Sequence, residues 1–233
     1  MNNASIETFS QKFAANKELE SILYYPHPFT KGGIILVCQN DISDFLALVA
    51  EAYANQPSSL SLHCVRRGEL FQLSLPGLFA PPLQVNERTH LPYWLKYKGV
   101  VLAGVDLRHE VDLPTDPTLL LAGHIEGCMD YLRRYGILTA LIHKENEALV
   151  SMLAREMRYL MGTALLIHDV WDVSLETLPV QFEAAFPDSK PMQIWQKFQL
   201  EQDKFRQAAA PQLTIEMVWL FEQFLHALRE YIS

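Results

Sequence analysis

The chain has 233 residues, of which 49% are hydrophobic and 20% are charged, a composition typical of a globular protein with one large or two small domains. The formal net charge of -8 argues against a nucleic-acid partner, because a phosphate backbone is bound by a basic surface. No apolar run reaches the roughly 20 residues that span a bilayer, and the polar N-terminal stretch lacks a signal-peptide core. We therefore expect a cytoplasmic protein without a membrane partner.

The first half of the chain alternates between helix and strand patterns. Two apolar runs joined by the short turn Lys31–Gly33 predict an antiparallel hairpin. Asn40 or Asp41 is the expected cap of the next helix, and Pro92 is expected in the first turn of a later one. We expect helices at residues 6–19, 41–54, 68–75 and 89–98, and strands at residues 20–25, 34–38, 60–65 and 100–102.

After Val111 the pattern becomes helical throughout. Asp116 is the expected cap of the first helix, with Pro117 at the first helical position. This segregation predicts an α+β fold, with a small α/β domain at residues 1–112 followed by an all-α helical bundle at residues 113–233. We expect helices at residues 117–135, 145–168, 175–186, 192–207 and 213–231.

The helix predicted at residues 145–168 carries a long apolar stripe. Leu149, Leu153, Met157 and Leu160 recur at a spacing of three or four residues, which places them on one side of a helix. We expect this helix to be the spine of the bundle, with later helices packed against it. Arg155, Arg158, Glu156 and Ser151 are expected on the helix surface, away from the stripe.

Three stretches carry a resemblance to a known family: SILYYPHPFTKGGIILVCQN, KGVVLAGVDLRHEV and REMRYLMGTALLIHDVWDVSLETLPVQFEAAFPD. Together with the order helix, strand, turn, strand, helix, strand and helical bundle, they resemble the nucleotidyltransferase superfamily with the DNA polymerase β-type fold. More narrowly, the chain looks like the small bacterial members related to aminoglycoside adenylyltransferases. The resemblance implies a catalytic α/β domain, a helical substrate domain and Mg²⁺-dependent nucleotide transfer.

The chain departs from this family where the family binds metal. Active members carry Gly-Ser after the first strand, Asp-x-Asp at the start of the second and a third carboxylate on the following strand, and these carboxylates hold Mg²⁺. Here the first two positions read Tyr25–Pro26 and Gly32–Ile34, and the third strand offers Ser61 and His63. No Asp or Glu lies between residues 21 and 40. We therefore predict a binding or regulatory pseudoenzyme without a metal or other cofactor.

Two alternatives remain open. An active metal-dependent nucleotidyltransferase acting on a small molecule would need non-standard acids such as Asp41, Asp44, Glu69 or Glu87. A protein-interaction module, comparable to the nucleotidyltransferase-like antitoxins, would use the cleft or the last helix. That helix is apolar around much of its surface at residues 219–232, which predicts a homodimer through it.

A cleft between the two domains is the predicted ligand site. Arginines there would bind a nucleotide or another small anionic ligand, and a tryptophan would stack on it. The competing interpretations are an exposed loop around residues 106–110 and ion pairing of the arginines with Glu147, Glu156 or Asp169. The predicted cleft residues are Asp106, Arg108, Arg155, Arg158, Trp171 and Asp172.

Metal-ligand residue types also gather at His124, Glu126, Cys128 and Asp130. Residues two apart on a helix point to different sides, so these four do not converge. Only His124 and Cys128 share a face, at a spacing of four residues. Two ligands without a third do not make a metal site, so we expect both side chains to be packed in the core.

Overall fold

The structure of the chain is a computed structural model that describes residues 3–26, 32–39, 44–57, 60–70, 85–113, 116–136, 147–207 and 211–232. The chain divides into two compact units, Met1–Pro76 with Glu87–Pro114 and Gly77–Asn86 with Thr115–Ser233. The first unit contains a mixed four-stranded sheet, and the second is helical. The predicted α+β fold with a helical C-terminal portion is therefore confirmed.

The sheet of the first unit has the strand order β3-β2-β1-β4. β1 (Leu19–Tyr25) and β2 (Gly33–Cys38) form the predicted antiparallel hairpin, in which Leu23 lies opposite Ile35. β3 (Ser61–Arg66) pairs with β2 in parallel. A parallel neighbour requires a crossover, and α2 (Phe45–Ala54) lies in that crossover. β4 (Val100–Gly104) pairs antiparallel with β1 at the sheet edge, as predicted.

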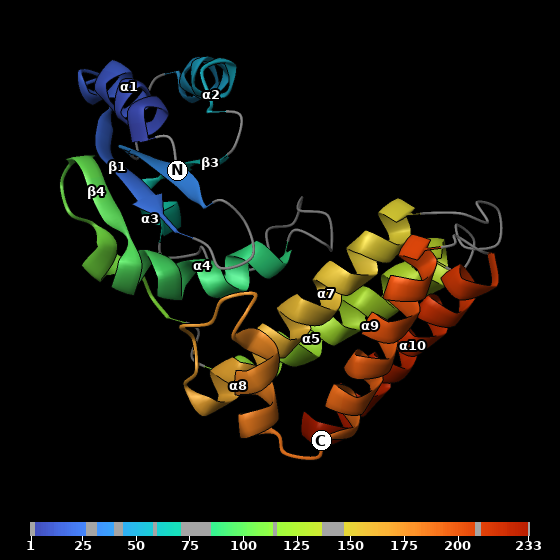
Figure 1. Cartoon of the computed structure of the whole chain (residues 1–233). Helices are drawn as coiled ribbons and strands as arrows, with labels where there is room; N and C mark the ends of the chain where they lie inside the picture. Colours follow the sequence, from blue (N-terminus) through green and yellow to red (C-terminus); the bar gives the residue numbers. More distant parts are fainter. Residues whose placement is uncertain are drawn as a thin grey trace. The chain divides into compact units, whose positions relative to one another are not determined.

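Helices cover both faces of this sheet (Figure 1). Alternate residues of a strand point to opposite faces, so Ile34 and Leu36 pack with α1 (Asn3–Ala14) and α2, whereas Ile35 and Val37 pack on the other face. That second face is covered by α3 (Arg67–Leu70), α4 (Val85–Lys98) and the segment that follows β4. All residues of β2 are consequently buried.

Several predicted boundaries in this unit are wrong. α4 begins at Val85, so Pro92 lies inside the helix rather than in its first turn. The side chain of Asp44, not Asn40 or Asp41, caps α2 by accepting a hydrogen bond from the Ala47 amide at 3.0 Å. Residues 40–43 and 71–75 lie outside the described residues. α1 ends at Ala14, five residues before the predicted end, because the chain turns there into β1.

The second unit is built from helices, close to the predicted ranges. Asp116 caps α5 as predicted, accepting from the amides of Thr118 and Leu119, and Pro117 opens the helix. A π-helical turn, Leu132–Gly136, extends α5, and a 3-10 turn, Leu166–His168, extends α7. The helices are α5 (Pro117–Tyr131), α7 (Glu147–Leu165), α8 (Leu178–Ala185), α9 (Lys190–Gln207) and α10 (Pro211–Ile232).

α7 is the spine of this unit, as predicted, because it contacts α5, α8, α9 and α10 (Figure 1). Leu153, Met157 and Leu160 are fully buried along it. The prediction that Glu156 lies on the helix surface is wrong, since only 1% of this residue is exposed. Among the described residues, no helix combines the length and apolarity needed to cross a membrane.

We expect Gly104→Ala to lower the free energy of unfolding by at least about 2 kcal/mol. Gly104 has a φ of +81°, and an added Cβ would lie 2.1 Å from the carbonyl oxygen of Glu20 on the neighbouring strand. Urea unfolding followed by circular dichroism measures the loss. The matched control is Gly123→Ala, where an added Cβ meets nothing within 4 Å on an exposed face of α5. The free energy of unfolding of this control should rise by about 0.5–1 kcal/mol. Equal urea midpoints for the two variants would contradict the expectation.

Candidate functional site

The predicted cleft residues are divided between the two units. Asp106 and Arg108 belong to the first unit, whereas Arg155, Arg158, Trp171 and Asp172 belong to the second. A ligand site that draws on both sets therefore stays a prediction. Within each unit, hydrogen bonds and ion pairs show which of these side chains already bind a neighbouring residue and which face a hollow.

Asp106 and Arg108 bind each other. The Nε and Nη2 atoms of Arg108 donate to the two carboxylate oxygens of Asp106 at 2.8 and 2.6 Å, and the third guanidinium nitrogen donates to the Gly99 carbonyl. The hydrogen bonds from Arg108 lower the pKa of Asp106 to about 2. Because this bidentate pair occupies the fork of the guanidinium, Arg108 is poorly placed to bind an anionic ligand.

Arg155 also has a carboxylate partner, because its Nε lies 3.4 Å from Oε1 of Glu156 on the same helix. Glu156 is one of the three acids of the competing interpretation, but this pair lies within one helix and does not join two helices. Trp171 and Asp172 follow the 3-10 turn Leu166–His168, where Trp171 is half-buried and Asp172 is exposed. Neither of them lines the hollow that contains Arg158.

Arg158 of α7 faces a hollow of about 450 Å³ formed largely by α9. Its guanidinium lies over the ring of Trp195, 5.6 Å from the ring centre. No carboxylate among the described residues forms an ion pair with Arg158, whereas the neighbouring Arg206 is held by Asp203 at 3.3 Å. Burial, followed by the like charge of Arg206, lowers the pKa of Arg158. The lining residues are Arg158, Gln196, Gln199, Leu200, Gln202, Asp203 and Arg206.

This hollow brings together two arginines, one aspartate and three glutamines. A negatively charged group near the two arginines would offset their mutual repulsion and the cost of burying Arg158. The glutamine amides add hydrogen-bond donors and acceptors around it. Arg158 was predicted from the sequence as a ligand residue, but its partners on α9 were not.

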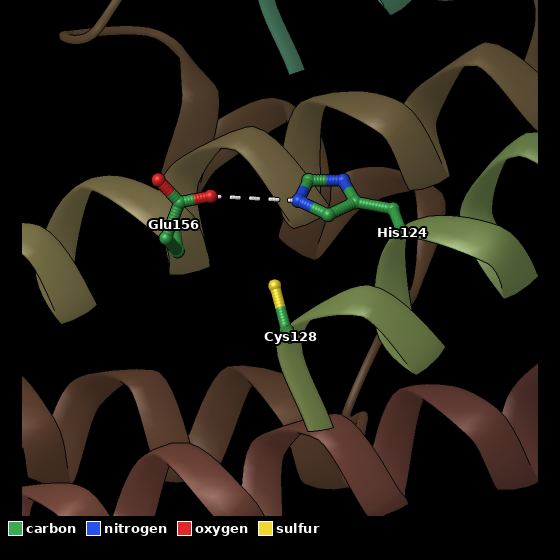
Figure 2. Close-up of side chains that lie close together, drawn as sticks. All are labelled: His124, Cys128 and Glu156. Atoms are coloured by element: carbon green, nitrogen blue, oxygen red, sulfur yellow. Dashed lines mark ion pairs between the residues drawn. The ribbon is translucent and has the colours of Figure 1, made fainter. Parts of the chain in front are cut away.

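A second cluster is buried in the helical unit. His124 and Cys128 come from α5 and Glu156 comes from α7, and the three side chains point toward one another (Figure 2). Nε2 of His124 lies 3.5 Å from Oε2 of Glu156, and the three potential ligand atoms all lie within 4.8 Å of one another. Neither ring nitrogen of His124 has a hydrogen-bond partner among the described residues. A buried polar atom without a hydrogen bond lowers the free energy of unfolding by about 1–3 kcal/mol.

Local helix geometry explains how this cluster forms. His124 and Cys128 lie one turn apart on the buried face of α5, beside Leu121 and Ile125. Glu156 follows Leu153 by three residues and precedes Leu160 by four, so it lies on the apolar stripe of α7. Burial, followed by the negative charge of Glu156, raises the pKa of the Cys128 thiol above its ordinary range.

The sequence indicated two of the three members of this cluster. The spacing of four residues paired His124 with Cys128, whereas Glu156 was expected on the surface, although its spacing from the stripe leucines was a usable signal. The prediction that Glu126 and Asp130 point away is confirmed. Glu126 pairs with Arg229 at 3.1 Å, and Asp130 pairs with Arg134 at 2.9 Å.

The first unit contains no group of three metal-ligand side chains among its described residues. Of the non-standard acids, Asp44 is the cap of α2 and Glu69 accepts from the Arg66 amide at 2.8 Å. Asp41 and the side chain of Glu87 lie outside the described residues.

Other polar side chains near the sheet are also partnered. Arg67 donates to Glu20 at 2.9 Å and to Glu110 at 2.7 Å, so two acids share one guanidinium. His63, on the third strand, lies with its Nε2 atom 2.9 Å from the Tyr25 hydroxyl, and the two share a hydrogen bond. Arg67 and His63 therefore form internal pairs with their neighbours.

Comparison with known proteins gives no family for this chain. No family model matches it, and a search of curated proteins found no match.

We expect the Asp106 carboxyl to titrate at a pKa of about 2 and to return toward its ordinary value of 3.8 in Arg108→Gln. Because the folded-state pKa is lowered, the pair stabilises the fold above pH 3.8, and this contribution is lost as the pH falls through about 2. Carboxyl-carbon NMR follows the titration directly. Arg134→Gln, which removes a different exposed ion pair, is the control and should leave Asp106 unchanged. An unshifted Asp106 in the unmodified protein would contradict the pairing.

Proposed function

We propose that this chain is a nucleotidyltransferase-like protein that does not transfer nucleotides and that binds a small anionic ligand through its helical unit. The observation that carries the proposal is the convergence of Arg158 and Arg206 on one hollow. The family assignment rests on the stretches that resemble the superfamily. The order α1–β1–β2–α2–β3 followed by a helical unit is consistent with it.

The absence of catalysis is supported by the chemistry of the central strands. β2 carries only glycine, aliphatic residues and a cysteine, and all its residues are buried. Transfer from a nucleoside triphosphate needs carboxylates that hold Mg²⁺ against the phosphates. Among the described acids of the first unit, Glu20, Glu110 and Asp106 are bound by arginines instead.

The ligand class follows from the side chains around Arg158. A guanidinium that stacks on an aromatic ring presents its edge to a phosphate or carboxylate. The Trp195 ring lies under the Arg158 guanidinium here. Arg206 lies in the same hollow, where Asp203 holds it at 3.3 Å and three glutamines surround it. A nucleotide or another phosphorylated or carboxylated metabolite fits this description.

We expect thermal-shift screening with ATP, ADP and inorganic phosphate to show stabilisation that does not depend on Mg²⁺. A ligand at a hundred times its Kd stabilises a protein by roughly 2.7 kcal/mol, which is measurable. Arg158→Gln should weaken binding at least about tenfold, because it removes a charged hydrogen-bond donor. Arg134→Gln, in the π-helical turn that follows α5, is the matched control, since its ion pair with Asp130 is exposed.

Two outcomes would overturn this proposal. A shift that requires Mg²⁺, together with metal-dependent AMP transfer, would establish the active-transferase alternative. The absence of a shift with any of the three probes would remove the nucleotide and phosphate classes from this site.

A second candidate function is protein interaction through α10, for which we propose a homodimer. Most apolar residues of α10 pack within the same chain, but Ile215 and Trp219 stay about half exposed, one turn apart. Lys197 of α9 lies over the Trp219 ring, and Leu200 is exposed one turn further along α9. Apolar side chains grouped in this way favour contact with another protein surface.

We expect light scattering at micromolar concentration to give a dimer mass, and Trp219→Glu to give the monomer mass because a charge would be buried at the contact. Leu119→Glu is the control, because Leu119 is an exposed leucine on α5. A monomer mass for the unmodified chain would contradict the dimer, and stoichiometric co-purification of another protein would favour the antitoxin-like alternative.

A further inference from the structure

We propose that His124, Cys128 and Glu156 form a binding site for a divalent transition metal, best matched by Zn²⁺, in the interior of the helical unit. The proposal goes beyond the anionic-ligand function and does not depend on it. It rests on the donor types, their separations, the missing hydrogen bonds of the histidine ring and the charge balance of the buried group.

The donor set matches zinc rather than magnesium. An imidazole nitrogen, a thiolate sulfur and a carboxylate oxygen are the three ligand types of protein zinc sites, and a water molecule commonly adds the fourth ligand when the protein supplies three. Magnesium selects oxygen ligands in octahedral geometry and has little affinity for thiolates. His124 and Cys128 also have the one-turn spacing that puts two ligands on the same face of a helix.

The separations suit a tetrahedral ion. Zinc–ligand distances of about 2.0–2.3 Å place two ligand atoms of a tetrahedron roughly 3.3–3.6 Å apart. The 3.5 Å between His124 Nε2 and Glu156 Oε2 falls in this range, although it is too long for a good hydrogen bond. The upper limit of 4.8 Å for the three pairs exceeds the tetrahedral edge by about 1.2–1.5 Å. Binding of an ion would therefore draw the side chains closer together.

The cluster is buried, and an arginine lies beside its carboxylate. His124 is 4% exposed, its two ring nitrogens lack hydrogen bonds among the described residues, and its Nε2 atom faces Glu156 at 3.5 Å. Arg155 lies 3.4 Å from Oε1 of Glu156, on the carboxylate oxygen that does not face His124. An outer partner of this kind orients a ligating carboxylate, and Figure 2 shows the other oxygen directed at the imidazole.

Charge balance favours an ion in this buried position. Metal binding breaks the S–H bond of Cys128, forms a metal–sulfur bond and releases the thiol proton to solvent. A divalent ion with one thiolate, one carboxylate and a neutral imidazole has no net charge. Such a neutral group can be buried at lower cost than an isolated ion. Because the ligands come from α5 and α7, the ion would also join these two helices.

The test uses the full-length chain produced in medium supplemented with Co²⁺, so that the metal is present while the protein folds. Cobalt substitutes for zinc and reports a bound thiolate by a charge-transfer absorption band. We expect about one cobalt per chain and this band in the unmodified protein. Cys128→Ser should lose the band, and Cys64→Ser should keep it, because Cys64 lies on β3 in the other unit.

A second variant guards against misfolding of the buried mutant. Arg155 is exposed, so Arg155→Gln should fold normally and still weaken metal binding about 10–100-fold, as loss of an outer partner does. Its Kd is measured by competition with a chromophoric chelator. His226→Asn, an exposed histidine on α10, is the control and should bind metal like the unmodified chain.

The proposal is overturned if the unmodified chain carries no stoichiometric cobalt or shows no charge-transfer band. It is also overturned if folded Cys128→Ser retains the band, or if His226→Asn removes the bound metal while Arg155→Gln has no effect, because the metal would then lie elsewhere. Metal content, the band and the chelator competition are independent of nucleotide binding. Failure of the anionic-ligand proposal would therefore leave this result unaffected.

Discussion

The burial of β2 on both faces is the constraint on which the first unit depends. Every residue of this strand is buried, and helices pack against both sides of the sheet. A carboxylate on such a strand needs a cation or several donors, because an unpaired buried charge is expensive. The apolar composition of Gly33–Cys38 therefore permits the three-layer packing and, at the same time, leaves the strand without carboxylates.

The ionisable groups discussed above differ in burial between the two units. In the first unit, Arg67 and Arg108 bind nearby acids close to the surface, where solvent screens the pairs and they contribute little to stability. In the second unit, His124, Cys128 and Glu156 are almost fully buried, so their interactions act in a low dielectric and imperfect pairing is costly. The candidate metal ligands therefore lie in the helical unit, whereas the family resemblance predicts them on the sheet.

Local patterns in the sequence predicted much of the fold. The turn at Lys31–Gly33 between two apolar runs predicted the hairpin, and Asp116 followed by Pro117 predicted the start of α5, because each signal depends on neighbouring residues alone. The parallel pairing of β3 with β2 depends on a crossover that no local pattern encodes. Pro92 was misplaced because a proline marks a helix start more often than a helix interior.

The candidate sites were harder to predict because each joins distant parts of the chain. Arg158 was predicted, but Arg206 and Trp195 reach it only through the packing of α9 on α7. Glu156 was missed for a different reason. Its polarity suggested the surface, whereas its spacing from Leu153 and Leu160 placed it on the buried stripe. A charged residue on an apolar stripe marks either a destabilised helix or a buried partner, and His124 is that partner.

α7 links the two candidate sites of the helical unit. Glu156 and Arg158 are two residues apart, so their side chains leave the helix in nearly opposite directions. One meets α5 at the buried cluster, and the other meets α9 at the hollow. Both places therefore depend on the packed position of α7, which contacts α5 and α9. A substitution that shifts α7 would change the buried cluster and the surroundings of Arg158 together.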